Sequence, residues 1–280
     1  GQGYPYTCPN QRWRMIFIDT HCHLDAAEFD ADRDAVACSA YASGVSGIII
    51  PAVQRANFAA VCKLAGQHAH CVPALGIHPM YVDNAQPQDL GLLADLIEEK
   101  QPVAVGEIGL DFFVQGFNRE RQEYYFSEQL KLARRFDLPV ILHVRRAIDD
   151  ILKHLRRIVV KGGIAHAFNG SRQQADEFIK LGFKLGFGGA MTYSRALKIR
   201  QLAASLPLQA IVLETDAPDI APEWIGSGGR NSPDQLAKIA QVLADLRGLK
   251  LAEVAEITTQ NALAVMPKMA QLCTPLHVSH

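Results

Sequence analysis

One short stretch near the start of the chain decides the fold: Phe17-Ile18-Asp19-Thr20-His21-Cys22-His23. The apolar residues 15–18 lead directly into two histidines that a single residue separates. Because side chains alternate between the two faces of an extended strand, His21 and His23 are expected to point one way and Cys22 the other. Two neighbouring imidazoles at the end of a buried strand provide half of a divalent-metal site. For this pair taken alone, the alternative is a chance pairing at the surface.

The composition is that of a globular protein with enough chain to bury a core. Hydrophobic residues make up 49% of the 280 residues, and the formal net charge is −1. No apolar run reaches the roughly 18 residues that a membrane-spanning helix requires. The six cysteines form no CxxC motif, which is typical of a reducing compartment and predicts a cytoplasmic protein. Any polyanion must therefore be bound by a local cluster of Arg and Lys, because the protein as a whole is nearly neutral.

Short apolar runs alternate with longer amphipathic segments along the chain. The runs expected to form strands are residues 15–18, 47–53, 71–77, 102–108, 139–144, 162–168, 183–187 and 210–213. The segments with a helical pattern are residues 33–43, 57–68, 87–100, 119–136, 146–157, 172–181, 195–206, 232–247 and 251–265. About eight such units in roughly 250 residues indicate a (β/α)8 TIM barrel with a parallel sheet. The alternative, a doubly wound open sheet, is disfavoured because no Gly-rich dinucleotide-binding turn follows the first strand.

The barrel is expected to occupy a single domain, residues 15–267. Met15 resembles a natural start, so residues 1–14 are interpreted as an N-terminal extension or a remnant of cloning; they lack the long apolar segment of a secretory signal. Residues 268–280 are expected to form a C-terminal tail. Residues 218–232 are rich in Pro and Gly, and we interpret them as a long functional loop within the barrel.

Histidine or a carboxylate stands at the end of most of the expected strands. The candidates are His21, His23, His78, Glu107, His143, His166 and Asp216. In a TIM barrel the carboxyl ends of the strands face the same side and carry the catalytic groups. Imidazoles and carboxylates are the usual ligands of Zn, Mn and, for carboxylates, Mg. These residues therefore predict one shared site for divalent cations.

The candidate ligands divide into two sets around a shared carboxylate. One cation is expected at His21, His23 and Asp216, and a second at His143 and His166, with Glu107 between the two. A metal-bound water loses a proton near neutral pH, and Asp216 is the candidate to orient that water or accept the proton. Glu107 and Asp216 are accordingly the candidate catalytic carboxylates. The alternative for each carboxylate is a structural ion pair or helix cap, and for His143 and His166 a hydrogen-bonded place in the core.

Three further residues are candidates for contact with the substrate. His78 ends the third expected strand without a place in either metal shell, so it is expected to contact the substrate, to steady the leaving oxygen, or to pack in the core. Arg145 and Arg230 fall in or beside expected loops at the carboxyl ends of strands. Because guanidinium groups bind phosphate oxygens through paired hydrogen bonds, these two arginines are the candidate substrate-binding residues.

Taken together, these strand ends resemble the TatD family of metal-dependent deoxyribonucleases, and most of all its YjjV-type branch. The segments that carry the resemblance are FIDTHCHLD (17–25), ALGIHP (74–79), VGEIGLD (105–111), LPVILH (138–143), HAFNGS (166–171) and LETDAP (213–218). The resemblance implies an amidohydrolase-type TIM barrel that hydrolyses DNA with divalent cations. It implies the same six metal ligands as above and a catalytic role for His78. The segment 227–233 matches the family's basic loop only loosely, so the resemblance supports no role for Arg230.

The expected function is that of an exonuclease-like deoxyribonuclease with two divalent cations (Mg, Mn or Zn). Its expected partner is single-stranded DNA or DNA ends, with no membrane and no obligate protein partner. Phe112, Phe113 and Tyr193 are candidates for stacking on unpaired bases, although a core or lid role is the commoner one for such aromatic residues. The alternative function is hydrolysis of a small ester, amide or lactone, because the same activated water attacks a carbonyl. Convergent arginines beside an open groove favour the nuclease, and a closed apolar pocket favours the small-molecule hydrolase.

Overall fold

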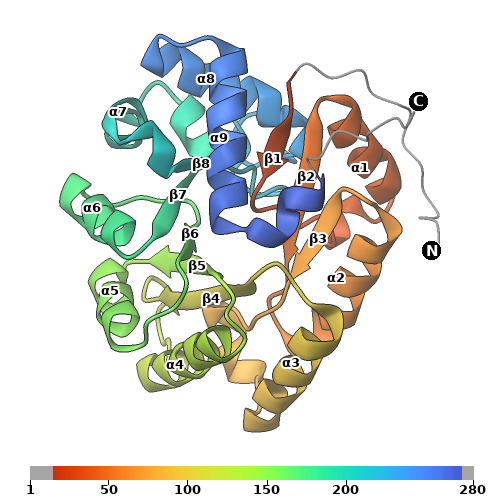
Figure 1. Ribbon diagram of the computed structural model, residues 1–280, viewed down its shortest axis with the longest axis vertical. Helices are drawn as coiled ribbons and strands as arrows, with labels where there is room; N and C mark the ends of the chain where they lie inside the picture. The colour runs from red at the N-terminus through yellow and green to blue at the C-terminus, as the bar shows by residue number, and fades with distance from the viewer. Residues whose placement is uncertain (1–14, 273–280) are drawn as a thin grey trace.

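Eight strands, each followed by a helix, build a parallel barrel in the computed structural model, which describes residues 15–272 (Figure 1). The strands are β1 (Phe17–Asp19), β2 (Val45–Pro51), β3 (Cys71–Ala74), β4 (Val105–Asp111), β5 (Val140–Arg145), β6 (Gly163–Ala165), β7 (Phe183–Phe187) and β8 (Ile211–Leu213). The helices are α1 (Arg33–Ala42), α2 (Arg55–Gln67), α3 (Pro87–Lys100), α4 (Arg119–Arg135), α5 (Ile148–Arg157), α6 (Arg172–Lys180), α7 (Leu197–Ser205), α8 (Leu236–Arg247) and α9 (Leu251–Val265). None of these helices is long and apolar enough to cross a membrane.

Hydrogen bonds between neighbouring strands close the sheet into a ring. The ladders run β1-β2-β3 and β4-β5-β6-β7-β8, and every pair in them is parallel. A bridge between Leu75 and Val105 joins β3 to β4. The amide of Thr20 donates to the carbonyl of Leu213 at 3.1 Å and so joins the end of β1 to β8. The predicted (β/α)8 barrel is therefore confirmed, and the open doubly wound sheet is excluded because an open sheet leaves its outer strands unpaired.

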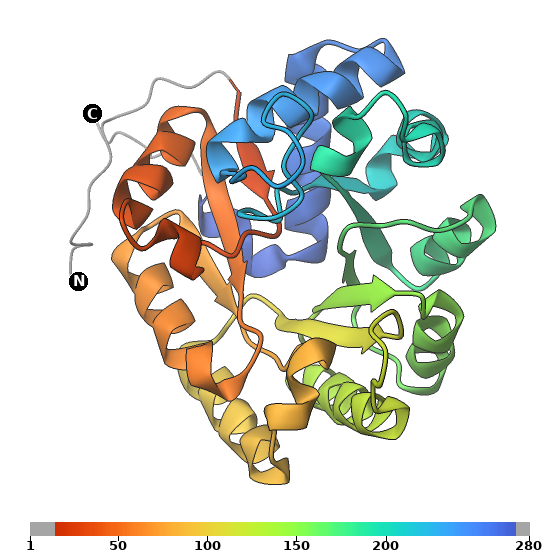
Figure 2. The ribbon, with the colours of Figure 1, turned by 180° about the vertical axis from the view of Figure 1, so that it is seen from behind.

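The core lies in two layers, because each strand is buried on both faces. The larger cluster fills the space between the strands and the surrounding helices, and includes Leu24, Ile48 and Phe126. The smaller cluster takes single residues from the strands, such as Ile18, and packs them against α9. Figure 1 shows α9 crossing one end of the barrel, and Figure 2 shows the opposite end, where the loop after β8 lies in front. The helix thus closes one end, and the other is left for the site.

Several element boundaries differ from the predicted ones. Strand β4 begins at Val105 instead of residue 102, because pairing with β5 starts there, and it continues to Asp111. Glu107 consequently lies inside the strand. Helix α5 begins at Ile148, two residues later than predicted, because Arg146 has a left-handed backbone (φ +53°) that a right-handed helix cannot include. Helix α8 begins only at Leu236, after a separate 3-10 turn over residues 233–235.

The packed part of the chain continues past the predicted end of the domain. Met269, in the 3-10 helix that spans Pro267–Leu272, is fully buried in the smaller core cluster. The barrel therefore includes residues that the sequence assigned to a C-terminal tail beginning at residue 268. The predicted extension, residues 1–14, and residues 273–280 lie outside the described residues.

Candidate metal centre

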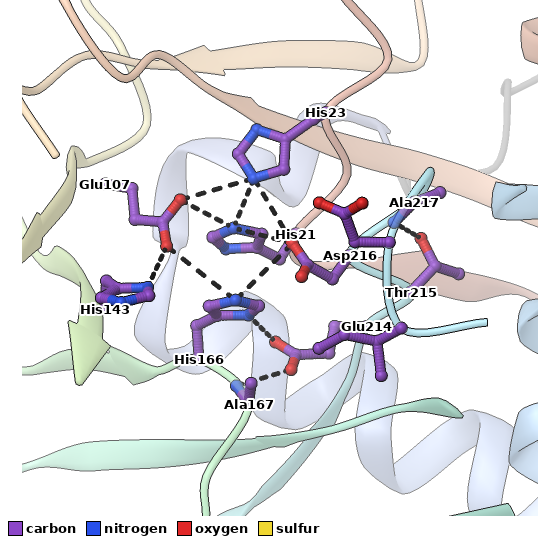
Figure 3. Close-up of polar contacts among 12 residues, drawn as sticks. His21, His23, Glu107, His143, His166, Ala167, Glu214, Thr215, Asp216 and Ala217 are labelled. Carbon is purple, nitrogen blue, oxygen red and sulfur yellow. Dashed lines mark hydrogen bonds and ion pairs between the residues drawn. The ribbon is translucent and has the colours of Figure 1, made fainter. Parts of the chain in front are cut away.

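The structure brings all seven predicted strand-end residues together at one end of the barrel. Figure 3 shows six of them side by side: His21, His23, Glu107, His143, His166 and Asp216. The imidazole of His78 completes the group, with its Nε2 atom 3.5 Å from Glu107 Oε2. Above them opens a cavity of about 1200 Å³. The residues lie in or directly after six different strands, so their convergence follows from barrel closure.

Four donor atoms surround one point at the bottom of the cavity. The Nε2 atom of His21 lies 3.1 Å from Glu107 Oε1, 3.2 Å from His23 Nε2 and 3.5 Å from Asp216 Oδ1. The Nε2 atom of His23 lies 3.4 Å from Glu107 Oε1 and 3.3 Å from Asp216 Oδ1. Tetrahedral ligands held about 2.1 Å from a metal ion are about 3.4 Å from each other, so this spacing fits a cation. Hydrogen bonds alone do not explain why these four atoms lie so close together, because a ring nitrogen carries at most one proton.

The second oxygen of Glu107 faces a different set of imidazoles. Glu107 Oε2 lies 3.2 Å from His143 Nδ1, 3.5 Å from His78 Nε2 and 3.9 Å from His166 Nε2. The Nε2 atom of His166 is also 3.6 Å from Asp216 Oδ1. Glu107 thus stands between two groups of donors, as the sequence predicted. His78, which was predicted outside both metal shells, lies next to the second group, and its ring forms one set of possible ligands with Glu107 and His143.

The pKa shifts of Glu107 and His166 show that the site attracts positive charge. Burial by itself raises the pKa of Glu107, but the neighbouring imidazoles of His21 and His78 outweigh burial and hold that pKa well below its ordinary value. For His166, burial lowers the pKa, but the carboxylates of Glu214 and Asp216 outweigh burial and raise it to about 10. Glu107 therefore remains ionised, and the surrounding carboxylates draw positive charge to the imidazole of His166. A bound cation would supply the same positive charge, so the donor set fits a divalent metal ion.

Two buried carboxylates orient the imidazoles of His166 and His143 by binding the ring nitrogen that points away from Glu107. Glu214 Oε2 accepts a hydrogen bond from His166 Nδ1 at 2.9 Å, and its Oε1 accepts from the amide of Ala167 at 2.6 Å. Asp111 Oδ2 accepts from His143 Nε2 at 2.8 Å. Such partners fix the tautomer, so that the other ring nitrogen, which faces the centre, carries the lone pair. Both residues follow expected strands, in the segments VGEIGLD and LETDAP, but no role was predicted for either.

The backbone after β8 positions Asp216 in an unusual conformation. Asp216 has a left-handed backbone (φ +56°), which is rare for a residue other than glycine. Its amide donates to the carbonyl of His21 at 2.8 Å, and the amide of His23 donates to the carbonyl of Ala217 at 2.8 Å. These two bonds tie the end of β1 to the segment after β8. Asn231, which the sequence reading missed, donates to three carbonyls of the same segment and holds it in place.

A third buried carboxyl group, that of Asp19, joins the same two segments. Its Oδ1 accepts hydrogen bonds from the amides of His21 and Thr215, at 3.2 and 3.0 Å, and its Oδ2 accepts from the Thr215 hydroxyl. Burial raises the pKa of Asp19 to about 7. The oxygens of Asp19 bind the backbone of His21 and the backbone and hydroxyl of Thr215, so Asp19 supports the two segments that carry the candidate ligands.

The two predicted substrate-binding arginines have different places. Arg145 lines the cavity, and its Nε donates to Asp111 Oδ2 at 2.9 Å. Arg230 borders a neighbouring cavity of about 610 Å³, and its guanidinium donates twice to the carboxylate of Asp32, at 2.8 Å each. Within the described part of the chain, Arg230 is not among the residues that line the cavity above Glu107. Arg145 is therefore the only one of the pair that lies beside the candidate metal centre.

Comparisons with known proteins identify the family of the chain. Residues 18–267 match the family described as TatD related DNase. The chain is 44% identical over 248 residues to the metal-dependent hydrolase YjjV of Escherichia coli K12, covering 88% of this chain and 95% of that protein. It is 32% identical over 270 residues to the human protein named Deoxyribonuclease TATDN3, covering 91% of this chain and 96% of that one.

A solved structure extends the likeness to three dimensions. The crystal structure of YjjV, a TatD homologue from Escherichia coli K12, superposes with a TM-score of 0.86 at 43% sequence identity. The superposition covers 90% of this chain and 98% of that one. With the family match over nearly the whole barrel, this likeness shows that the chain belongs to the TatD family and is a metal-dependent hydrolase.

Proposed function

We propose that this protein is a deoxyribonuclease that cleaves phosphodiester bonds in single-stranded DNA or at DNA ends, using two divalent cations. The observation that carries the proposal is Glu107, whose two oxygens face two separate groups of imidazoles at 3.1 to 3.9 Å. A carboxylate between two cations is typical of sites that hydrolyse phosphate esters. The name of the human relative, a deoxyribonuclease, supports the same choice of substrate.

The ligand sets follow from these distances. One cation would be held by His21, His23, Asp216 and Glu107 Oε1. The other would be held by His143 Nδ1, His166 Nε2 and Glu107 Oε2, with His78 beside it. When bound, such a pair of cations lowers the pKa of a coordinated water and neutralises charge on the phosphate. Mg, Mn and Zn all remain candidates, because mixed imidazole and carboxylate ligands suit each of them to some degree.

Asp216 is the residue best placed to handle the proton of the attacking water. Burial raises its pKa, but the imidazoles of His166 and His23 outweigh burial and keep that pKa below its ordinary value. Asp216 is therefore an anion near neutral pH and can accept a proton. Its side chain lines the cavity, where substrate and water enter.

His78 is suited to donate a hydrogen bond to the substrate. Its Nδ1 accepts a hydrogen bond from the amide of Met80 at 3.0 Å, so the proton of the neutral ring is on Nε2. Burial lowers the pKa of His78, which keeps the ring neutral near pH 7. The Nε2–H group faces the cavity beside Glu107, where it can bind a phosphate oxygen or the leaving oxygen.

The cavity favours DNA over the alternative substrates. It is wide, lined by polar and charged groups, and carries Arg145 and Arg146 at its mouth. Guanidinium groups at the mouth suit a phosphodiester, whereas a small ester or lactone needs an enclosed apolar pocket. The test is hydrolysis of an end-labelled single-stranded oligonucleotide, with Mg, Mn or Zn titrated into metal-free protein, beside a panel of esters and lactones. We expect metal-dependent cleavage of the oligonucleotide. Turnover of the panel alone would contradict the proposal.

A further inference from the structure

An exposed aromatic ring at the mouth of the cavity holds two arginines. Phe113 follows β4 and lines the cavity, although 51% of its surface is exposed. The guanidinium carbons of Arg145 and Arg146, at the end of β5, lie 4.4 and 4.9 Å from the centre of its ring. Cation–π attraction favours each contact by about 0.5–1 kcal/mol at an exposed position. The ring therefore gathers two positive charges at one side of the site.

Arg146 has no counter-charge within the described residues. Arg145 is partly neutralised, because its Nε donates to the buried carboxylate of Asp111. No carboxylate of residues 15–272 forms an ion pair with Arg146. Two guanidinium groups on one ring repel each other, and an anion bound between them relieves that repulsion. The arrangement thus points to a bound phosphate, which accepts several hydrogen bonds from guanidinium groups.

The opposite wall of the cavity has the opposite charge. In a barrel of eight strands, β1 and β8 stand across from β5 and β4. The side chains of Asp25 and Glu28, which follow β1, and of Asp219, which follows β8, line the cavity there. The Oδ1 atom of Asp25 is buried and has no hydrogen-bond partner among the described residues. These carboxylates would repel a phosphate at that wall.

The wall near β5 also contains two carboxylates, but both have partners. Asp149 and Asp150, at the start of α5, line the cavity. Asp150 is paired with Arg119, and Asp149 accepts a hydrogen bond from the side-chain amide of Gln174. The wall near β5 thus carries Arg146 and the carboxylate of Asp149, whereas the opposite wall carries three carboxylates and, within residues 15–272, no lining Arg or Lys, so the charge of the two walls is uneven.

We propose that Arg145 and Arg146, held over the ring of Phe113, bind the phosphate next to the scissile one. The carboxylates of Asp25, Glu28 and Asp219 exclude a phosphate on the other side. The strand thus enters past β4 and β5 and ends against β8 and β1, so the substrate is a strand end that carries a hydroxyl group and no terminal phosphate. The inference rests on the proposed function and adds the direction and the kind of end that the site accepts. In this arrangement Phe113 is a positioning residue.

Binding to the metal-loaded protein tests the arginines. The probe is a dye-labelled oligothymidylate with phosphorothioate linkages that slow cleavage, and the dissociation constant is measured by fluorescence anisotropy at several salt concentrations. We expect Arg146→Gln to weaken binding about tenfold. It should also reduce the slope of log Kd against log salt by about 0.7, the value for one phosphate contact in a single strand. Phe113→Leu should weaken binding several-fold, and Phe113→Tyr, which keeps the ring, should restore it.

Arg135→Gln is the matched control. The guanidinium carbon of Arg135 lies 4.8 Å from the ring centre of Phe136, which is the same kind of contact. It lies at the end of α4 and is not among the residues that line the cavity. The control should leave both the dissociation constant and the salt slope unchanged. If Arg146→Gln behaves like Arg135→Gln, the proposed phosphate subsite is wrong.

The acidic wall is tested with the ends of the oligonucleotide. Four probes carry a hydroxyl or a phosphate at the 5′ end or the 3′ end. A phosphate at one of the two ends should weaken binding at least tenfold, and Asp219→Asn should reduce that penalty. Equal binding of all four probes would overturn the acidic-wall part of the inference. If the protein cleaves DNA but these variants change nothing, the inference fails and the proposed function stands; if it cleaves no DNA, the proposed function itself fails.

Discussion

At the scale of single residues, Glu107 is the group on which the site depends. It is 1% exposed, and its two oxygens face different imidazoles. Glu107→Gln keeps the size of the side chain but replaces one carboxylate oxygen with an amide group that does not bind metal. We expect hydrolysis to fall by about a thousandfold or more, since a shared ligand is lost. The checks are the initial rate on an oligonucleotide and the number of cations bound, with circular dichroism to show that the barrel is folded. Full metal-dependent activity would contradict the assignment.

Glu214 offers a second test at this scale. Its carboxylate accepts from His166 Nδ1 and from the amide of Ala167, so Glu214→Gln should misorient the imidazole without removing a proposed ligand. Partners of this kind typically change metal affinity by about 10–100-fold. Isothermal titration with Mn²⁺ should show a loss in that range. Glu177→Gln, on the exposed face of α6, is the control and should bind Mn²⁺ like the unchanged protein. Equal affinity in both variants would argue against a role for Glu214.

The sequence predicted which residues converge at the site, but not which of them face the centre and which support an imidazole. Alternation in strands and the shared direction of parallel strands were enough to bring His21, Glu107 and Asp216 to one place. Glu214 was visible as a strand end, yet nothing in the sequence separates a group that faces the centre from one that supports an imidazole. That difference depends on the register of neighbouring strands. The pairing of Arg230 with Asp32 could not be predicted from the sequence either, because the two residues are 198 residues apart in the chain.

At the scale of elements, the close approach of β4 and β5 requires a glycine. Gly109 has φ +152°, and a Cβ atom there would lie 1.9 Å from the carbonyl oxygen of His143. Gly109→Ala would force the two strands apart beside the site. We expect it to reduce the free energy of unfolding by about 2–4 kcal/mol, measured by urea denaturation. Gly91→Ala is the control, because a Cβ atom on that helical residue meets nothing within 4 Å; it should be neutral or stabilising. Equal effects would refute the argument.

Element boundaries were predictable where local chemistry marks them. Helix α3 spans the predicted residues because Pro87 stands at its first turn and Gln86 and Asp89 form a capping box. Helix α5 was predicted two residues too early, because Arg146 continues the helical pattern of polar residues while its backbone is left-handed. The left-handed backbone of Arg146 lies in the turn between β5 and α5, which borders the cavity. The misprediction thus falls at a residue to which we assign a function.

At the scale of the whole molecule, a buried histidine away from the metal centre should make stability depend on pH. Burial lowers the pKa of His70 to about 4, and its Nε2 donates to the carbonyl of Ala37. The folded state therefore favours the neutral ring, while the unfolded chain titrates near 6.5. This stabilisation is complete above pH 6.5 and is lost as the pH falls from 6.5 to 4. The loss should be about 2–3 kcal/mol.

The variant His70→Gln isolates this contribution. Glutamine keeps a donor for Ala37 and does not titrate, whereas the neighbouring His68 and Tyr41 are unchanged. Urea denaturation at pH 7.5 and pH 4.5 should show a smaller loss of stability for the variant than for the unchanged protein. The same loss in both proteins would assign the pH dependence to other groups, such as the imidazoles of the metal centre.

The account rests on one claim about the whole barrel: its closure brings donors from distant segments around Glu107 to hold two cations. Anomalous diffraction from crystals soaked in Mn²⁺ tests this claim most directly. We predict two peaks about 3.5–4 Å apart, one on each side of the Glu107 carboxylate. The first should lie among His21, His23 and Asp216, and the second beside His143 and His166. Peaks elsewhere in the molecule, with none next to Glu107, would contradict the claim.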